Sequence, residues 1–345
     1  MDDRLLICVP RGGLNDTLCQ IGKCWTYAER WNRKLFIDPA LGGLFGFLWD
    51  VFEEQPYTAA FRDSVIVRDR AAAMALADGR PIRPACLAPY YGKSARNARY
   101  AEFDSEQFRF VHIGTREPTS FDLHRNYPED VLVHHDCGGG TESVGVLHRI
   151  RLKPEIRDEV LARMTHLPKQ YVSVHVRSTD LTSDYKRFFE LFKDQLADRN
   201  VLVCSDNQAV IDHAQAVLTS SAVYTNETRR STTGEEIHHA HKWDTSDEAR
   251  RRAALIELLT DLLALGRGTD ILVAPTFGPL MGSRRQRLKM KIERALRLEV
   301  PASNSGFSEL ARYLCANKDV LDLFAGVRSG PGQLADTEAA DMRAV

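Results

Sequence analysis

The chain has 345 residues, of which 43% are hydrophobic and 27% charged, an ordinary globular composition that is long enough to form two cores of ordinary domain size. Its 46 basic and 47 acidic residues leave a formal net charge of -1, which excludes a global field that would draw the chain to nucleic acid or to an anionic membrane. Any site for an anion must therefore be local.

The beginning of the sequence and its cysteines indicate where the protein works. Met1-Asp2-Asp3-Arg4 is acidic where a secretory signal is basic, and the apolar run after it is too short for a signal or a span, so we expect no integral membrane segment. The seven cysteines are an odd, scattered set without a C-x-x-C pair. Such a set is typical of reduced thiols, and we expect a cytoplasmic protein.

The opening of the chain has the pattern of a βαβ unit. The apolar run from Leu5 to Pro10 predicts a strand, residues from about Asn15 to Arg33 predict a helix, and Lys34 to Asp38 predicts a second strand. From residue 40 to 125 the pattern is weaker, and apart from a helix near Ala71 to Ala77 its elements cannot be ordered.

A boundary follows near residue 150. Val131 to His135 predicts one more strand of the first unit, and Pro154 predicts the start of the first helix of the next. We therefore expect a Rossmann-like domain over residues 1–150. The remaining chain divides into a second Rossmann-like domain at 151–300, a helical segment at 301–328 and a tail at 329–345 that is poor in large apolar groups and predicted to be disordered.

The second half predicts a parallel sheet covered by helices on both faces. Its strands are expected at Tyr171 to Arg177, Val201 to Asp206 and Ile271 to Pro275, with helices at Gln208 to Leu218 and Glu248 to Leu265. Near-continuous valine, leucine and isoleucine is typical of central strands that are buried on both faces.

Each of these strands ends in polar residues. Along the first of them Ser173, His175 and Arg177 point to one face, and the next strands end at Asp206 and at Thr276. Ligands of open α/β sheets bind outside the carboxyl ends of the strands, and a guanidinium group binds two phosphate oxygens at once. Arg177 therefore predicts a diphosphate site, with Asp180 orienting it or accepting a proton; the alternative is a strand-end ion pair without function.

The first βα turn, Arg11-Gly12-Gly13-Leu14-Asn15-Asp16, contains two glycines but neither a G-x-G-x-x-G nor a P-loop motif. Glycine allows close approach of the backbone, and the helix start behind it presents N–H groups to an anion. The alternative is a tight turn capped by Asn15 or Asp16.

Together these segments resemble the GDP-fucose-dependent fucosyltransferase superfamily. The resemblance rests on residues 11–18 with 25–28 and 33–38, on His175-Val176-Arg177-Ser178-Thr179-Asp180, on Val201 to Asp206, and on Asp261 to Leu265 followed by Asp270 to Thr276. It covers the first forty residues and roughly 147 to 290, in the same order and at similar spacing.

The resemblance implies a GT-B fold, in which two Rossmann-like domains face each other across a cleft. It further implies an inverting, metal-independent fucosyltransferase that uses GDP-fucose and a hydroxyl of a carbohydrate acceptor, with no nucleic acid as partner. By position, Arg177 would hold the β-phosphate, His175 and Asp261 would contact the guanine, Asp206 would lie near the nucleotide, and Gly13 would let the first loop approach the diphosphate. No metal ligand is implied.

The sequence also departs from the family pattern. Ser178 stands where many members carry a second basic residue, and Asn15 replaces a glycine of the first loop, although asparagine tolerates left-handed backbone. Thr276-Phe277-Gly278-Pro279 stands where the third motif usually ends in serines, so Thr276 or backbone N–H groups would serve the phosphates. Asp180 and Asp184 are the candidates for an acceptor base.

Two other functions stay open at this point, a GT-B transferase for another nucleotide sugar and an inactive nucleotide-binding or glycan-binding homologue. The histidines at 238, 239 and 241 with Asp244, and the pair His134 and His135, lack standard zinc spacing, and we expect a solvated loop in the first case and strand-end polar groups in the second. The basic run 283–291 could contact phosphate or an anionic acceptor, but we expect a solvated helix face there.

Overall fold

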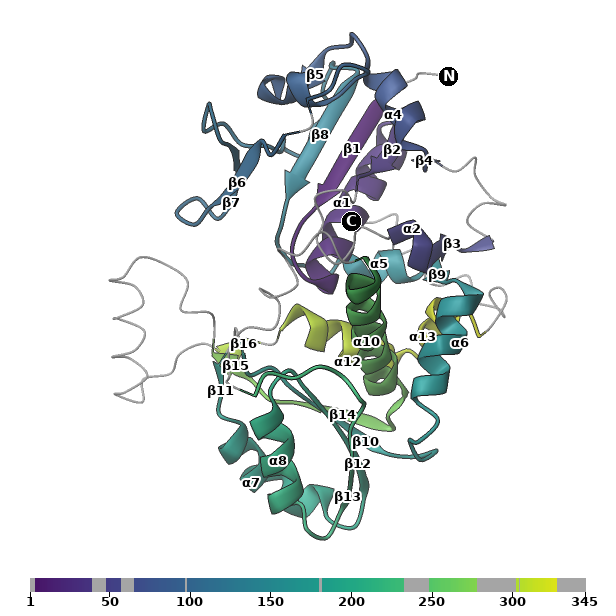
Figure 1. Cartoon of the computed structure of the whole chain (residues 1–345), viewed down its shortest axis with the longest axis vertical. Coiled ribbons are helices and arrows are strands. Elements are labelled where there is room, and N and C mark those ends of the chain that lie inside the picture. The colour runs from purple at the N-terminus through teal and green to yellow at the C-terminus, as the bar shows by residue number, and fades with distance from the viewer. Residues whose placement is uncertain are drawn as a thin grey trace.

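The computed structural model describes residues 4–38, 48–56, 65–96, 98–179, 182–232, 248–277, 302–303 and 305–327. Two separate parallel sheets lie toward opposite ends of the long axis of the molecule, with a group of helices between them (Figure 1). The mixed α/β class with parallel sheets confirms the predicted class. The domain boundaries near residues 150 and 300 stay predictions.

The first sheet has the strand order β4-β2-β1-β8-β5, and all of its strand pairs are parallel. Its strands are β1 (Leu5–Pro10), β2 (Lys34–Ile37), β4 (Ile66–Val67), β5 (Ile82–Arg83) and β8 (Val131–Asp136). Successive side chains of β1 point to opposite faces, where Leu6 packs in one hydrophobic cluster with helix α1 (Leu14–Arg30) and Ile7 packs in another with α4 (Arg70–Ala77). The predicted βαβ opening is confirmed, although the helix ends at Arg30 because Asn32 adopts a left-handed conformation.

The second sheet has the strand order β13-β12-β10-β14, again with parallel pairs. Its strands are β10 (Val172–Val176), β12 (Asn200–Ser205), β13 (Ala222–Tyr224) and β14 (Asp270–Val273), and its helices are α7 (Tyr185–Leu196), α8 (Gln208–Val217) and α10 (Glu248–Arg267). Val174 packs with α7 and α8. Ser173 points the other way, and its hydroxyl donates to the carbonyl of Leu265 in α10 at 3.0 Å. All three strands and both helices predicted in this half are confirmed.

The weakly patterned region and the connections form shorter elements. They are α2 (Leu48–Val51), β3 (Phe52–Glu54), the 3-10 helix η3 (Ala85–Tyr90), β6 (Ala101–Asp104), β7 (Arg109–His112), α5 (Ser143–Leu147), β9 (Ile150–Leu152), α6 (Pro154–Arg163), β11 (Thr182–Ser183), β15 (Thr276–Phe277) and β16 (Ala302–Ser303). β6 and β7 form an antiparallel hairpin that projects beside the end of β8 (Figure 1).

Two helices at the end of the described chain join the two halves. They are α12 (Gly306–Ala316) and α13 (Lys318–Phe324), and both lie in the predicted segment 301–328. The largest hydrophobic cluster includes Leu314 of α12 and Leu262 of α10 together with Leu18 of α1. This packing places the beginning of α12 near residues of both halves.

All seven cysteines are free thiols, as the sequence predicts. None of the described helices is long and apolar enough to cross a membrane. The predicted disordered tail, the histidines at 238, 239 and 241 and the basic run 283–291 lie outside the described residues.

Candidate functional site

Arg177 follows β10, and Asp206 at the end of the neighbouring strand β12 holds it in place. The Arg177 Nε lies 3.2 Å from Asp206 Oδ2, and the two side chains are only 16% and 12% exposed. The same carboxylate accepts hydrogen bonds from the backbone N–H of Ser178 at 2.8 Å and from the hydroxyl of Thr179 at 2.6 Å. Asp206 therefore fixes the guanidinium group and the loop behind it at the carboxyl edge of the sheet, because three donors converge on one carboxylate.

His175 lies on β10 two residues before Arg177 and is buried against the start of α12. Its Nδ1 lies 2.7 Å from the Ser308 hydroxyl, and its ring centroid lies 5.2 Å from that of Phe307. Burial, with a smaller effect of the Arg177 charge, lowers the pKa of His175 from its ordinary 6.5 to about 3. The imidazole is therefore neutral at physiological pH, with one donor and one acceptor nitrogen.

Helix α12 begins beside this strand end, with Ser305 as its N-cap. The Ser305 hydroxyl accepts a hydrogen bond from the Ser308 backbone N–H at 3.2 Å and lies 2.7 Å from the Ser308 hydroxyl. The first N–H groups of an α-helix have no acceptor within the helix and carry partial positive charge. Two hydroxyl groups and a helix N-terminus thus lie next to the strand that carries Arg177.

The sequence analysis did not single out these serines. The resemblance calls for serines directly after the third-motif strand, but the chain first passes through β15 and β16 and reaches Ser305 and Ser308 only then. A local signal was present, since a serine three residues before another opens the amphipathic stretch of α12. What the sequence could not supply is the contact with His175.

The first loop meets the start of α12 from the other side. Asn15 is buried, and its Oδ1 accepts a hydrogen bond from the Ser143 hydroxyl at 2.8 Å. A Cβ atom on Gly306 would lie only 2.5 Å from Asn15 Nδ2, so the two elements touch at a glycine. Gly13 is exposed, and a Cβ atom there would meet nothing within 4 Å. The described structure therefore gives no steric reason for glycine at position 13.

Asp261 lies on α10 and faces Cys204 of β12. Its Oδ1 accepts a hydrogen bond from Asn226 Nδ2 at 2.7 Å, and Cys204 Sγ lies 3.6 Å from the same atom. Loss of solvation raises the pKa of Asp261 from 3.8 to about 6, although the bond from Asn226 acts in the opposite direction. Cys204, which Asp261 faces, is the neighbour of His175 in the sheet. The two predicted guanine contacts therefore lie near adjacent strands, His175 bonded to Ser308 and Asp261 bonded to Asn226.

Two predicted residues, Thr276 and Asp184, lie on elements other than those of this group. Thr276 is fully buried in the central strand of the small sheet β11-β15-β16, between Ser183 and Ser303. Asp184 is exposed and caps α7, where its carboxylate accepts a hydrogen bond from the Arg187 backbone N–H at 3.3 Å. Asp180 lies outside the described residues. The roles of all three stay predictions.

The pair His134 and His135 lies at the end of β8, where a strand-end polar pair was expected. Nε2 of His134 lies 2.8 Å from Gln20 Oε1, and burial lowers the pKa of His134 to about 4 and that of His135 well below the ordinary range. Within the described ranges, no group of three or more histidine, cysteine, aspartate or glutamate side chains is placed to hold a metal ion.

Two cavities lie away from the Arg177 region. One of about 580 Å³ is lined by Arg163, His166, Thr225, Thr260 and neighbouring residues, and Thr225 and Thr260 directly precede Asn226 and Asp261 in the chain. The other, of about 470 Å³, lies along β5 and the segment that leads into β8. Neither is lined by Arg177, His175 or Asn15.

Comparison with solved structures identifies this arrangement with a known fold. No protein-family model and no curated protein sequence matches the chain. NodZ alpha-1,6-fucosyltransferase co-crystallized with GDP is similar with a TM-score of 0.53 and 16% identity, over 91% of this chain and 93% of that one. Fucosyltransferase NodZ from Bradyrhizobium is similar with a TM-score of 0.53 and 17% identity, over 91% and 94%. The chain therefore has the α/β fold of this GT-B fucosyltransferase over nearly its whole length, as the sequence resemblance implied.

Proposed function

We propose that the chain is an inverting, metal-independent glycosyltransferase that moves fucose from GDP-fucose to a hydroxyl of a carbohydrate acceptor. The observation that carries the proposal is the position of Arg177. Asp206 holds it at the carboxyl edge of the second sheet, two residues after the His175 that contacts the start of α12, in a fold shared with a fucosyltransferase that was crystallized with GDP.

The chemistry of the leaving group fits these residues. In the transfer, the bond between the anomeric carbon and the β-phosphate oxygen breaks while the acceptor oxygen bonds to the opposite face of that carbon and loses its proton. Negative charge then builds on the departing GDP. A fixed guanidinium group on one side and the start of α12 with Ser305 and Ser308 on the other stabilise that charge without rearranging, which is the most effective form of electrostatic catalysis.

The remaining roles follow from the resemblance and belong to the proposal. Gly13 leaves room for the diphosphate beside the first loop, which explains a glycine that the described packing does not need. Asn15 holds that loop to Ser143 and against α12. Asp261 and His175 recognise the guanine.

Two further assignments concern the phosphates and the acceptor hydroxyl. Thr276 contributes a phosphate contact through its strand. Asp180 and Asp184 remain the candidates for the base that takes the acceptor proton, and an exposed carboxylate such as Asp184 is accessible to a large acceptor.

The experiment is thermal denaturation with GDP, UDP, ADP or CMP, on the wild type, on Arg177→Ala and on Arg187→Ala, an exposed arginine of α7. A nucleotide at a hundred times its dissociation constant stabilises the folded state by about 2.7 kcal/mol, which raises the melting temperature by several degrees. We expect GDP alone to do so, in the wild type and in Arg187→Ala but not in Arg177→Ala.

Turnover of GDP-fucose is then measured with and without a chelator. We expect Arg177→Ala to lower the rate about a hundredfold or more, the usual cost of one preorganised charge-stabilising group. Stabilisation by UDP or ADP instead of GDP would refute the donor assignment. Binding of GDP without turnover on any acceptor would favour an inactive nucleotide-binding homologue, and loss of turnover with chelator would refute metal independence.

A further inference from the structure

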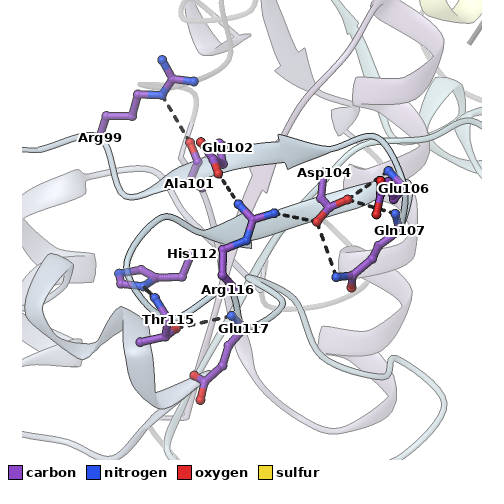
Figure 2. Close-up of polar contacts among 10 residues, drawn as sticks. All are labelled: Arg99, Ala101, Glu102, Asp104, Glu106, Gln107, His112, Thr115, Arg116 and Glu117. Carbon is purple, nitrogen blue, oxygen red and sulfur yellow. Dashed lines mark hydrogen bonds and ion pairs between the residues drawn. The ribbon is translucent and has the colours of Figure 1, made fainter. Parts of the chain in front are cut away.

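The hairpin of β6 and β7 has two chemically different faces. Cross-strand partners point to the same side, so Phe103 and its partner Phe110 share one face, while Glu102 and Asp104 share the other. Figure 2 shows the charged face, on which the guanidinium group of Arg116 bonds to both carboxylates, to Asp104 at 2.7 Å. Because Arg116 binds Glu102 and Asp104 of β6 at the same time, it stiffens the hairpin.

The turn of the hairpin is fixed as well. Asp104 Oδ1 accepts hydrogen bonds from the backbone N–H groups of Glu106 at 2.9 Å and Gln107 at 3.0 Å (Figure 2). Both bonds lower the pKa of Asp104, and the bond from Gln107 has the larger effect. The carboxylate therefore stays charged and keeps the turn closed. The hairpin is therefore a preformed element although it projects from the sheet.

The other face is aromatic and exposed. Phe103 is 37% exposed and Phe108, in the turn, is 59% exposed; their ring centroids lie 5.5 Å apart. With Ile113, which is 44% exposed, they make up three of the five exposed large hydrophobic residues of the described chain, the others being Leu191 and Val327. Concentration of exposed apolar side chains on one short element marks a binding surface.

Phe108 is also held in an unfavourable conformation. Its φ angle is 53°, in the left-handed region that bulky residues rarely occupy and that glycine adopts without cost. A glycine would therefore suit the turn better than a phenylalanine does. A strained residue whose ring faces solvent indicates a function for the ring.

Buried rings anchor the aromatic face beside the first βα loop. Phe103 packs edge-on against Phe110, with ring centroids 5.5 Å apart, and the Phe110 ring stacks on His135 at the end of β8. The guanidinium carbon of Arg11 lies 5.3 Å from the centroid of Phe110. Arg11 begins the loop that contains Gly13, so the aromatic rings lead from the hairpin turn to the first βα loop.

We propose that the aromatic face formed by Phe103 and Phe108 binds the sugar rings of an oligosaccharide acceptor, away from the sugar that receives the new bond. The proposal rests on the function proposed above. The C–H groups on one face of a pyranose carry partial positive charge and pack against the negative face of an aromatic ring, whereas the hydroxyl groups at the ring edge stay in water.

The size of the face argues against a protein partner. The side chains of Phe103 and Phe108 expose on the order of 200 Å² together, well below the roughly 800 Å² that each partner contributes to a standard protein interface. A surface of that area is suited to a short row of sugar rings, and the contact of Arg11 with the buried Phe110 places the hairpin beside the first βα loop.

The test compares Phe108→Gly and Phe103→Ala with Leu191→Ala, a control that removes an apolar side chain of α7 that is more exposed than either phenylalanine. The probes are tetrasaccharides of β-1,4-linked N-acetylglucosamine, β-1,4-linked glucose and α-1,4-linked glucose, together with their monosaccharides. Acceptor KM is measured in the transfer reaction, Kd by calorimetry, and hydrolysis of GDP-fucose by water in the absence of acceptor.

We expect each hairpin variant to weaken binding of the preferred tetrasaccharide about tenfold, equal to about 1.4 kcal/mol. Monosaccharide binding and donor hydrolysis should not change, and Phe108→Gly should melt no lower than the wild type. Weaker tetrasaccharide binding without a lower melting temperature distinguishes a phenylalanine that binds the acceptor from one that only stabilises the fold.

Other outcomes would overturn the inference. One is a tetrasaccharide Kd within twofold of the wild-type value in both hairpin variants. Another is a wild-type dimer that becomes a monomer in the variants while the acceptor Kd stays unchanged. Calorimetry measures acceptor binding without turnover. If the protein neither binds GDP nor transfers fucose, the proposed function is refuted, and the acceptor Kd values of the variants still test the hairpin.

Discussion

Replacing Asp261 with asparagine is expected to make the protein more stable at neutral pH. Loss of solvation raises the pKa of this carboxyl group from 3.8 to about 6 in the folded state. The folded state therefore binds the proton more tightly than the unfolded state does, so stability is greatest below the unfolded pKa and is lost as the pH rises through the folded one. The difference corresponds to up to about 3 kcal/mol, lost between about pH 4 and pH 7.

Asparagine is a suitable probe because it keeps the shape and the acceptor of Asp261. Its Oδ1 can still accept the hydrogen bond from Asn226, while the charge beside Cys204 is gone. The pKa also responds to Arg230, which lowers it, and to Glu257, which raises it, and both groups are unchanged in the variant.

The assay is the melting temperature of the wild type, Asp261→Asn and Asp194→Asn between pH 4 and pH 7.5. Asp194 is an exposed carboxylate of α7 and controls for loss of a charge. We expect Asp261→Asn to melt several degrees above the wild type at pH 7 and to approach it near pH 4, since each kcal/mol corresponds to about 2–4 °C. Parallel curves for the wild type and Asp261→Asn, or a less stable variant at pH 7, would refute the reasoning.

Two glycines test the contacts around the first loop. Gly13→Ala is expected to leave the melting temperature unchanged, because its Cβ meets nothing, and to weaken GDP binding about tenfold; lower stability with unchanged GDP affinity would contradict this. Gly306→Ala should cost about 1–3 kcal/mol, since its Cβ would lie 2.5 Å from Asn15 Nδ2. Asn15→Ala in the same chain removes Nδ2 and Cγ but keeps a Cβ 3.0 Å from the new methyl group, so it should recover part of that cost in denaturant unfolding, whereas simple addition of the two costs would argue against the contact.

Sequence periodicity predicted the elements that build the two sheets. The runs at Leu5 to Pro10 and Tyr171 to Arg177 are rich in apolar residues because helices cover both faces of each sheet, so that β1 and β10 are buried along their whole length. The polar ends of β10 and β12 were predicted to lie together because neighbouring parallel strands end at one edge, and Arg177 and Asp206 do so.

The parts that were not predicted depend on contacts between distant segments. Ser308 meets His175 across 133 positions of sequence, and Gly306 meets Asn15 across a still longer stretch. The aromatic hairpin was missed because its strands are four residues long and each alternates over too few positions to give a period.

Two positions around the proposed donor and acceptor sites hold residues that the fold itself does not favour. Asp261 opposes folding at neutral pH where asparagine would not, and Phe108 occupies a backbone conformation suited to glycine. The two departures differ in cause, since one is desolvation and the other is backbone strain. Their places coincide with the residues proposed for recognition of the guanine and for binding of the acceptor. The proposed ligands would account for both departures, because each side chain would then serve a molecule that the folded chain alone does not contain.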